Sequence, residues 1–122
     1  LEDCANRRAV QERIVQCRVF VGTVATLSTK GDLFRLKRFD VALVDEATQI
    51  LEPQLLGLLC ARSASGEDAI GKFVLIGDHK QLPAVVQQAS EHSEVHDEEL
   101  RQLGLYNLKD SLFERLYRHL TA

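Results

Sequence analysis

Apolar and polar residues form alternating blocks along this chain, and the spacing within each block predicts a local structure. Apolar residues recur at helical intervals over Leu1–Gln16, with charged residues between them. Three further blocks are rich in β-branched or other apolar residues and predict buried strands. These blocks are Val19–Leu27, Phe39–Val44 and Phe73–Ile76.

Helical patterns separate the predicted strands. Leu33–Phe39 predicts one or two turns, and Pro53–Arg62 predicts a longer helix that starts near its proline. A last helix is expected to open at Asp110 or Ser111, since either side chain can cap it. Gln87–Glu99 is polar and acidic and is expected to be a mobile loop. Strands that alternate with helices predict an α/β fold with a parallel sheet covered on both faces.

Composition and charge narrow the class of protein. The chain has 122 residues, of which 45% are hydrophobic and 27% charged, as expected of one globular domain. Its formal net charge of -3 gives no overall attraction to nucleic acid or anionic lipid. No apolar run is long enough to cross a bilayer, so no membrane partner is predicted. The three cysteines lack C-x-x-C spacing, which favours reduced thiols in the cytoplasm or the nucleus.

One segment has the spacing of a phosphate-binding P-loop but lies in the wrong structural context. Gly66, Gly71 and Lys72 fit GxxxxGK, but Phe73 stands where the motif has a Ser or Thr that ligates Mg²⁺. The segment also follows a predicted helix and precedes a predicted strand, whereas a P-loop does the reverse. We therefore interpret it as a flexible connection at the amino edge of the sheet, without a role in phosphate binding.

Carboxylates follow two of the predicted strands. Asp45 and Glu46 come directly after Phe39–Val44, and Gly77-Asp78 follows Phe73–Ile76. In parallel sheets, functional sites lie beyond the carboxyl ends of the strands. An apolar strand followed by Asp-Glu is typical of a Walker B element, in which the Asp holds Mg²⁺ and the Glu activates water. Taken alone, the same pattern also fits a strand followed by a capped turn.

Two longer strings add a family resemblance. DEATQ at residues 45–49 and GDHKQLP at residues 77–83 resemble motifs II and III of superfamily 1 helicases. The DEATQ form is similar to the 5′-to-3′ branch, which contains the nonsense-mediated-decay RNA helicase and the replication nuclease-helicase. Residues 22–28 resemble the Ic segment of the family, and SLFERL at residues 111–116 resembles the helix after motif III. The resemblance covers about residues 19–120 and implies a partial RecA-like, three-layer α/β domain without its P-loop strand.

The resemblance implies ATP and Mg²⁺ as cofactors and assigns roles to individual residues. Asp45 would hold Mg²⁺ through water, and Glu46 would be the catalytic base. Gln81 would sense the γ-phosphate and couple its loss to movement of the strand-binding surface. Asp78 would support the motif III turn, and Gln49 would help to link motif II to that turn.

The resemblance also implies partners. Thr23 and Thr26 would lie near the backbone of a single strand, which the sequence leaves open as DNA or RNA. The other partner would be the remainder of a parent helicase, with a P-loop segment upstream of Leu1 and a second RecA-like domain downstream. Residues 1–122 are accordingly expected to be a fragment of the first RecA-like domain, inactive alone. Ala84 departs from the family, in which many members have a second proline.

Two other functions fit part of the pattern. The first is a non-catalytic, helicase-derived module kept for protein contacts or strand binding, which intact Asp45, Glu46 and Gln81 argue against. The second is a nucleotidase or switch ATPase with a Walker B element but no unwinding activity. The Gln-Leu-Pro string that begins at Gln81 favours the helicase, because a generic ATPase does not need that loop.

Overall fold

The computed structural model describes residues 2–78, 80, 86 and 89–121. The chain forms two compact units. Unit 1 consists of Leu1–Ala42 and Gly57–Lys72, and unit 2 consists of Leu43–Leu56 and Phe73–Ala122. Within the described ranges, no helix combines the length and the apolar content that a bilayer span requires.

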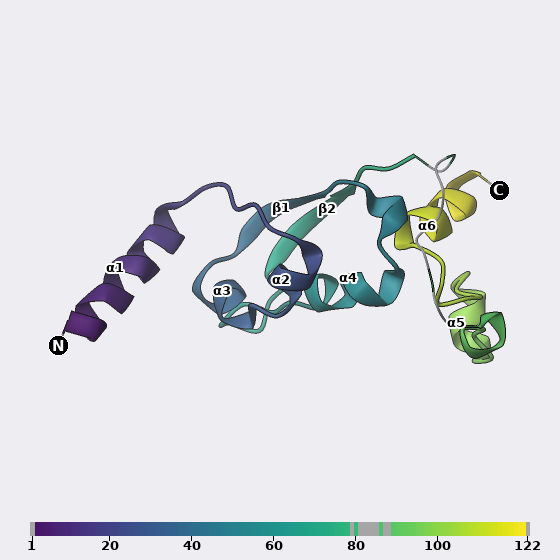
Figure 1. Ribbon diagram of the computed structural model, residues 1–122, viewed down its shortest axis with the longest axis horizontal. Helices are drawn as coiled ribbons and strands as arrows, with labels where there is room; N and C mark the ends of the chain where they lie inside the picture. The colour runs from purple at the N-terminus through teal and green to yellow at the C-terminus, as the bar shows by residue number, and fades with distance from the viewer. Residues whose placement is uncertain (1, 79, 81–85, 87–88, 122) are drawn as a thin grey trace. The chain divides into compact units, whose positions relative to one another are not determined.

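The predicted parallel pairing is present, and Figure 1 shows the two strands side by side. The strands are β1 (Phe39–Val44) and β2 (Ile70–Leu75). Near the start of the pair, the Phe39 amide donates to the Ala69 carbonyl at 2.8 Å. Near its end, the Ile76 amide donates to the Val44 carbonyl, also at 2.8 Å. The pairing advances in the same direction along both strands, so they are parallel, and the α/β prediction is confirmed.

The two faces of the strand pair differ in burial. Ala42 is half-buried and Val44 is buried, whereas Leu43 between them is 70% exposed. On β2, Val74 is likewise exposed. Since side chains alternate between the faces of a strand, one face contributes to the core and the other is left open by the described residues.

Unit 1 contains a cluster of aromatic rings. Its helices are α1 (Glu2–Gln16), α2 (Val24–Ser28) and α3 (Gly31–Leu36), and the first and last were expected from the sequence. Phe34 on α3 is buried, and its ring meets that of Phe39 edge-on with 5.9 Å between centroids. Phe20 meets the Phe39 ring in the same manner at 5.3 Å. The Lys37 ammonium donates to the Val15 carbonyl at 2.6 Å, which fastens the end of α3 to the end of α1.

The prediction of a strand over Val19–Leu27 is wrong. The segment is irregular up to Thr23, with Val21 95% exposed, and then enters α2. The Thr23 side chain caps this helix, because its hydroxyl oxygen accepts from the Thr26 amide at 3.2 Å. β-Branched residues favour a pleated, half-buried surface, and no strand in the described part of the chain pairs with this segment. A local cap therefore decides the conformation.

The third predicted strand begins earlier than expected, at Ile70 rather than Phe73. Gly71 and Lys72 therefore belong to β2, and a Cβ on Gly71 would lie 3.1 Å from the Asp40 carbonyl oxygen. Gly66 occupies a tight turn with φ of 82°, and its amide donates to the Ser63 carbonyl at 3.0 Å. The segment with P-loop spacing is thus a turn followed by a strand, as its context in the sequence indicated.

Helix α4 (Glu52–Leu59) begins one residue before Pro53. Proline is tolerated in the first turn of a helix, because an amide there has no partner within the helix. Its Leu55 is fully buried, and Leu58 is 5% exposed. The last predicted helix is α6 (Leu112–Thr121), and Ser111 rather than Asp110 caps it. The Ser111 hydroxyl accepts from the Glu114 amide at 3.1 Å, and the Glu114 carboxylate accepts from the Ser111 amide at 3.2 Å. This reciprocal pair is a capping box.

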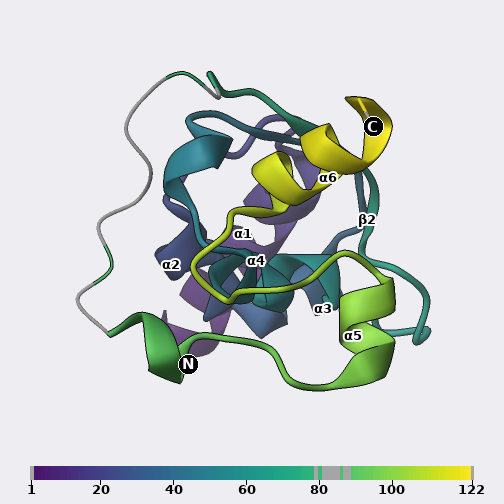
Figure 2. The same cartoon turned by 90° about the vertical axis from the view of Figure 1, so that its right-hand side faces the viewer.

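The acidic region between the third strand and α6 is more ordered than predicted, within the residues described. It contains η2 (Ser90–His92) and α5 (Glu98–Gln102), and a connection leads from α5 to α6 (Figure 2). Val95 is 6% exposed, and its amide donates to the Tyr106 carbonyl at 2.9 Å. Burial of this one apolar side chain and a bridge from Glu94 to Asn107 anchor a segment whose composition alone suggests a mobile loop.

Candidate functional site

Two carboxylates follow β1 directly, in unit 2. Asp45 and Glu46 are both exposed, and the Glu46 amide donates to Asp45 Oδ1 at 2.9 Å. Glu46 adopts φ of 52° and ψ of 38°, and no other non-glycine residue in the described ranges has a positive φ. A left-handed backbone at a residue with a side chain costs about 1–3 kcal/mol, and such strain clusters at functional sites. The turn therefore holds the carboxylate of Glu46 on an unusual, sharply bent backbone.

The end of β2 holds this turn in place. The Ala47 amide donates to the Ile76 carbonyl at 2.8 Å, immediately beyond the last pairing of β1 with β2. Ala47 begins the short helix η1 (Ala47–Gln49), in which the Gln49 amide donates to the Glu46 carbonyl at 2.9 Å. The strained residue thus lies between an anchored strand end and an anchored helical turn.

A glycine allows the second turn to approach the first. A Cβ added to Gly77 would lie 3.0 Å from Thr48 Cγ2 and 3.1 Å from the Thr48 amide nitrogen. Contacts this short are rare for a real Cβ, so a side chain at Gly77 would push the two turns apart. The sequence placed the two motifs at one edge of the sheet, and the structure brings Thr48 of DEATQ against Gly77, the first residue of GDHKQLP.

Asp78 is exposed, and its carboxylate is engaged within its own turn. The Lys80 amide donates to Asp78 Oδ1 at 2.9 Å, which is the hydrogen bond of an Asx turn. Such a bond fixes the direction in which the chain leaves β2. Gln81, which the resemblance places at the γ-phosphate, lies outside the described residues.

An ion pair that the sequence did not reveal fixes α6 to the segment after motif II. Arg115 Nε donates to Glu52 Oε2 at 2.7 Å, and Arg115 Nη2 donates to Glu52 Oε1 at 2.5 Å. The two side chains are only 20% and 11% exposed. The hydrogen bond to Glu52 raises the pKa of Arg115 above its ordinary value, against the opposing effect of burial. Figure 1 shows α6 beside the short helix that follows β1.

No pattern in the sequence links Glu52 to Arg115. They are 63 positions apart, and neither neighbourhood marks the other as its partner. The signal that the sequence did offer was that Arg115 falls within the SLFERL string.

The two threonines assigned to nucleic acid lie together in unit 1. Thr23 Oγ1 donates to Thr26 Oγ1 at 2.9 Å, and both residues are exposed. The Thr26 hydroxyl accepts this bond and keeps its own proton for an outside acceptor. The pair therefore offers a small polar surface at the start of α2.

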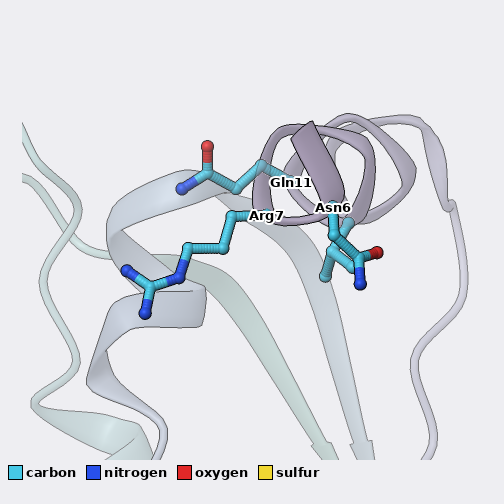
Figure 3. Close-up of a pocket in the computed structure, with 4 residues that line it drawn as sticks. Asn6, Arg7 and Gln11 are labelled. Atoms are coloured by element: carbon cyan, nitrogen blue, oxygen red, sulfur yellow. The ribbon is translucent and has the colours of Figure 1, made fainter. Parts of the chain in front are cut away.

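The hollow drawn in Figure 3 lies on a single helix, α1, away from the motif residues in the sequence. Asn6, Arg7, Val10 and Gln11 line it, and all four come from α1. Arg7 and Gln11 extend to one side of the helix, while Asn6 points away from them. A hollow lined by one helix lacks the convergent groups of a ligand site, so it is not a candidate site.

The motif II carboxylates fit a magnesium ion that is held mainly by phosphate and water. Asp45 uses one oxygen for the Glu46 amide, and no hydrogen bond from another described residue engages its second oxygen. Among the described residues, no three His, Cys, Asp or Glu side chains are grouped to hold a metal. Mg²⁺ in nucleotide sites needs only one or two carboxylates, with substrate phosphates and water completing its shell. One available aspartate oxygen is consistent with that arrangement.

Comparison with known proteins agrees with the motifs. The family model described as "AAA domain" matches residues 3–89. The DNA replication ATP-dependent helicase/nuclease DNA2 of Gallus gallus is 37% identical over 103 residues, which are 84% of this chain and 8% of that protein. Its Homo sapiens counterpart is 33% identical over 114 residues, 93% of this chain and 9% of that protein.

A relative of another name also matches. DNA polymerase alpha-associated DNA helicase A of Saccharomyces cerevisiae is 28% identical over 117 residues, which are 91% of this chain and 15% of that protein. This chain therefore spans only a small part of each of these three relatives. The matches confirm the resemblance to superfamily 1 helicases that the two motifs indicated.

Proposed function

This chain belongs to the AAA domain family, and on that premise we propose that the full-length protein hydrolyses ATP to move along single-stranded DNA as a helicase or translocase. The relatives are named as DNA helicases, which favours DNA over RNA as the strand. An intracellular setting, cytoplasmic or nuclear, belongs to the same proposal because DNA is the substrate. Residues 1–122 contribute motifs II and III, and other parts of the protein contribute the P-loop and the second RecA-like domain.

In this proposal the motif II carboxylates divide the chemistry between them. Asp45 holds Mg²⁺ through water, and the ion, when bound, neutralises charge on the phosphate oxygens. Glu46 accepts the proton of the attacking water at its carboxylate. Its backbone is held in the left-handed conformation by the Ala47–Ile76 hydrogen bond, which favours one position of the base.

Motif III connects hydrolysis to movement. Asp78 shapes the start of the loop through its bond to the Lys80 amide. Gln81 then contacts the γ-phosphate and responds to its loss, a role that rests on the GDHKQLP string. Gln49 is the last residue of motif II, lies on η1 and links the motif to that loop.

Strand binding involves unit 1. Hydroxyl groups are common donors to phosphate oxygens in nucleic-acid complexes. Thr26 has a proton available for this purpose, and Thr23 fixes the orientation of the Thr26 hydroxyl. These contacts would position the strand without reading its sequence.

The observation that carries the proposal is the direct link between the two motif turns, through the Ala47–Ile76 hydrogen bond and the Thr48–Gly77 contact. A Walker B strand in a structural role requires no such partner. The link supports the proposal because, with Glu46 as the base and Asp45 as the metal-binding carboxylate, both would lie close to the start of the loop that senses phosphate.

The test is steady-state ATP hydrolysis by the full-length protein, with and without single-stranded DNA. Glu46→Gln keeps shape and polarity but cannot take the proton, so turnover should fall by about a hundredfold or more while ATP affinity is nearly unchanged. Glu98→Gln, at an exposed acid on α5, makes the same change of charge and should have no effect. Near-normal turnover of Glu46→Gln would remove Glu46 from the role of base. A wild type that binds strands without hydrolysing ATP would be a non-catalytic module.

A further inference from the structure

The Thr48 side chain carries a buried hydroxyl next to the turn that holds Asp45 and Glu46. Thr48 is 3% exposed, and its Oγ1 has no hydrogen-bond partner among the residues that the structure describes. A buried hydroxyl without a partner destabilises a protein, and most buried polar atoms are paired. Valine has nearly the same shape and would avoid this penalty. The hydroxyl therefore needs a reason other than the packing seen here.

The position of Thr48 suggests the reason. Thr48 lies two residues after the proposed base Glu46, and its neighbour Ala47 is bonded to the end of β2. Its Oγ1 lies 3.4 Å, and its Cγ2 3.0 Å, from the place where a Gly77 side chain would begin. The unpaired hydroxyl therefore adjoins the point at which β2 ends and motif III starts.

We propose that Thr48 is a positioning residue for ATP hydrolysis, whose hydroxyl forms a hydrogen bond with the start of motif III during the catalytic cycle. The proposal rests on the function proposed above. Gly77 has no side chain, so a small shift of motif III past Thr48 meets no steric barrier from a Cβ. Such a shift would give the hydroxyl a backbone acceptor that the present arrangement does not offer.

The two parts of the Thr48 side chain have separate tasks in this proposal. Cγ2 packs against Gly77 and sets the spacing of the two turns, while Oγ1 stabilises the shifted arrangement. A contact with two arrangements is what coupling between sites requires, since each ligand favours one of them. Thr48 acts on the reaction through Glu46 and motif III, without touching the nucleotide itself.

Two conservative variants of the full-length protein separate these tasks. Thr48→Val keeps the packing and removes the hydroxyl, and Thr48→Ser keeps the hydroxyl and removes Cγ2. Strand-stimulated ATP hydrolysis gives kcat and KM for each, and thermal unfolding gives Tm. A purely structural Thr48 would change kcat only in step with Tm.

We expect Thr48→Val to lower kcat by about tenfold, the rate effect of one hydrogen bond, with KM nearly unchanged and Tm equal to or above that of wild type. We expect Thr48→Ser to keep most of kcat and to lower Tm. A wild-type kcat in Thr48→Val would overturn the inference, and so would a loss of kcat that follows Tm in both variants. An inactive wild type would instead reject the proposed function.

Discussion

Within the described part of the chain, each unit contains a buried hydroxyl without a hydrogen-bond partner that packs against a glycine, but the two contacts have different surroundings. In unit 1, this hydroxyl is Ser28 Oγ, and a Cβ on Gly57 would lie 2.8 Å from Ser28 Cβ. That contact joins the end of α2 to the middle of α4. In unit 2, the contact of Thr48 with Gly77 joins two carboxylate-bearing turns. If the proposal for Thr48 holds, similar local geometry serves packing alone in unit 1 and both packing and positioning in unit 2.

The two units also contain ion pairs, and these differ in burial. Arg115 and Glu52 in unit 2 form a bidentate pair whose side chains are 20% and 11% exposed. Arg62 and Asp68 in unit 1 also form an ion pair, but their side chains are 59% and 63% exposed. Solvent screens the exposed pair, whereas the buried carboxylate of Glu52 depends on its partner.

The largest effect should come from removing one partner of the buried pair. Arg115→Ala leaves the Glu52 carboxylate buried without a cation, which should destabilise the contact of α6 with η1 by about 3–5 kcal/mol. Arg62→Ala in the exposed pair should cost at most about 1 kcal/mol. Hydrogen exchange of the full-length protein measures both, through the amides of α6 and of residues 61–69. If Arg115→Ala and Arg62→Ala lose equal protection, then burial does not determine how much each ion pair contributes to stability.

A smaller effect should come from adding a methyl group to each glycine. Gly57→Ala forces Ser28 Cβ to move and should destabilise unit 1 by about 1–3 kcal/mol, with ATP hydrolysis per folded molecule unchanged. Gly77→Ala should separate the motif turns and lower hydrolysis directly. Folded fraction by circular dichroism and steady-state turnover give the two readouts.

A second substitution sharpens this contrast. Thr48→Ser deletes the Cγ2 atom that a Cβ on Gly77 would meet, so it should partly restore hydrolysis to Gly77→Ala. Ser28→Ala retains the Cβ that lies 2.8 Å from a Cβ on Gly57, so most of the stability lost in Gly57→Ala should stay lost. If Gly77→Ala hydrolyses ATP at the normal rate, then the close contact between Thr48 and Gly77 has no role in hydrolysis.

These contacts mark the limit of what the sequence predicts. The bounds of β1 and the carboxylates after it follow from a local pattern, and the structure places them as expected. Val19–Leu27 was mistaken for a strand because strand formation depends on a partner, while the Thr23 cap needs only its neighbours. The region around Val95 was predicted to be a mobile loop, because an acidic composition does not reveal that one apolar side chain is buried. Long-range contacts have no local pattern at all.

The same limit applies to the candidate site. DEATQ and GDHKQLP place the motifs at one edge of the sheet, but the resemblance assigned no task to Thr48 or Gly77. The two residues are far apart in the chain, and they approach so closely that a Cβ on Gly77 would lie 3.0 Å from Thr48 Cγ2. Motif spacing does not predict such a contact. The left-handed backbone of Glu46 also cannot be predicted from the sequence, since Glu has no preference for that conformation.

The smallest expected effect concerns the hydroxyl of Ser28, the counterpart of Thr48 in unit 1. Ser28→Ala removes an unpaired buried oxygen and keeps Cβ, so unit 1 should lose no contact and gain up to about 1 kcal/mol. ATP hydrolysis should be unchanged, whereas Thr48→Val, an equivalent loss of one hydroxyl, should lower it. Hydrogen exchange in residues 24–28 and turnover of the full-length protein measure the two quantities. If Ser28→Ala lowers turnover as much as Thr48→Val, then the surroundings of the two contacts do not determine their roles. If instead Ser28→Ala weakens protection in α2, then the Ser28 hydroxyl has a partner and the contacts are not alike.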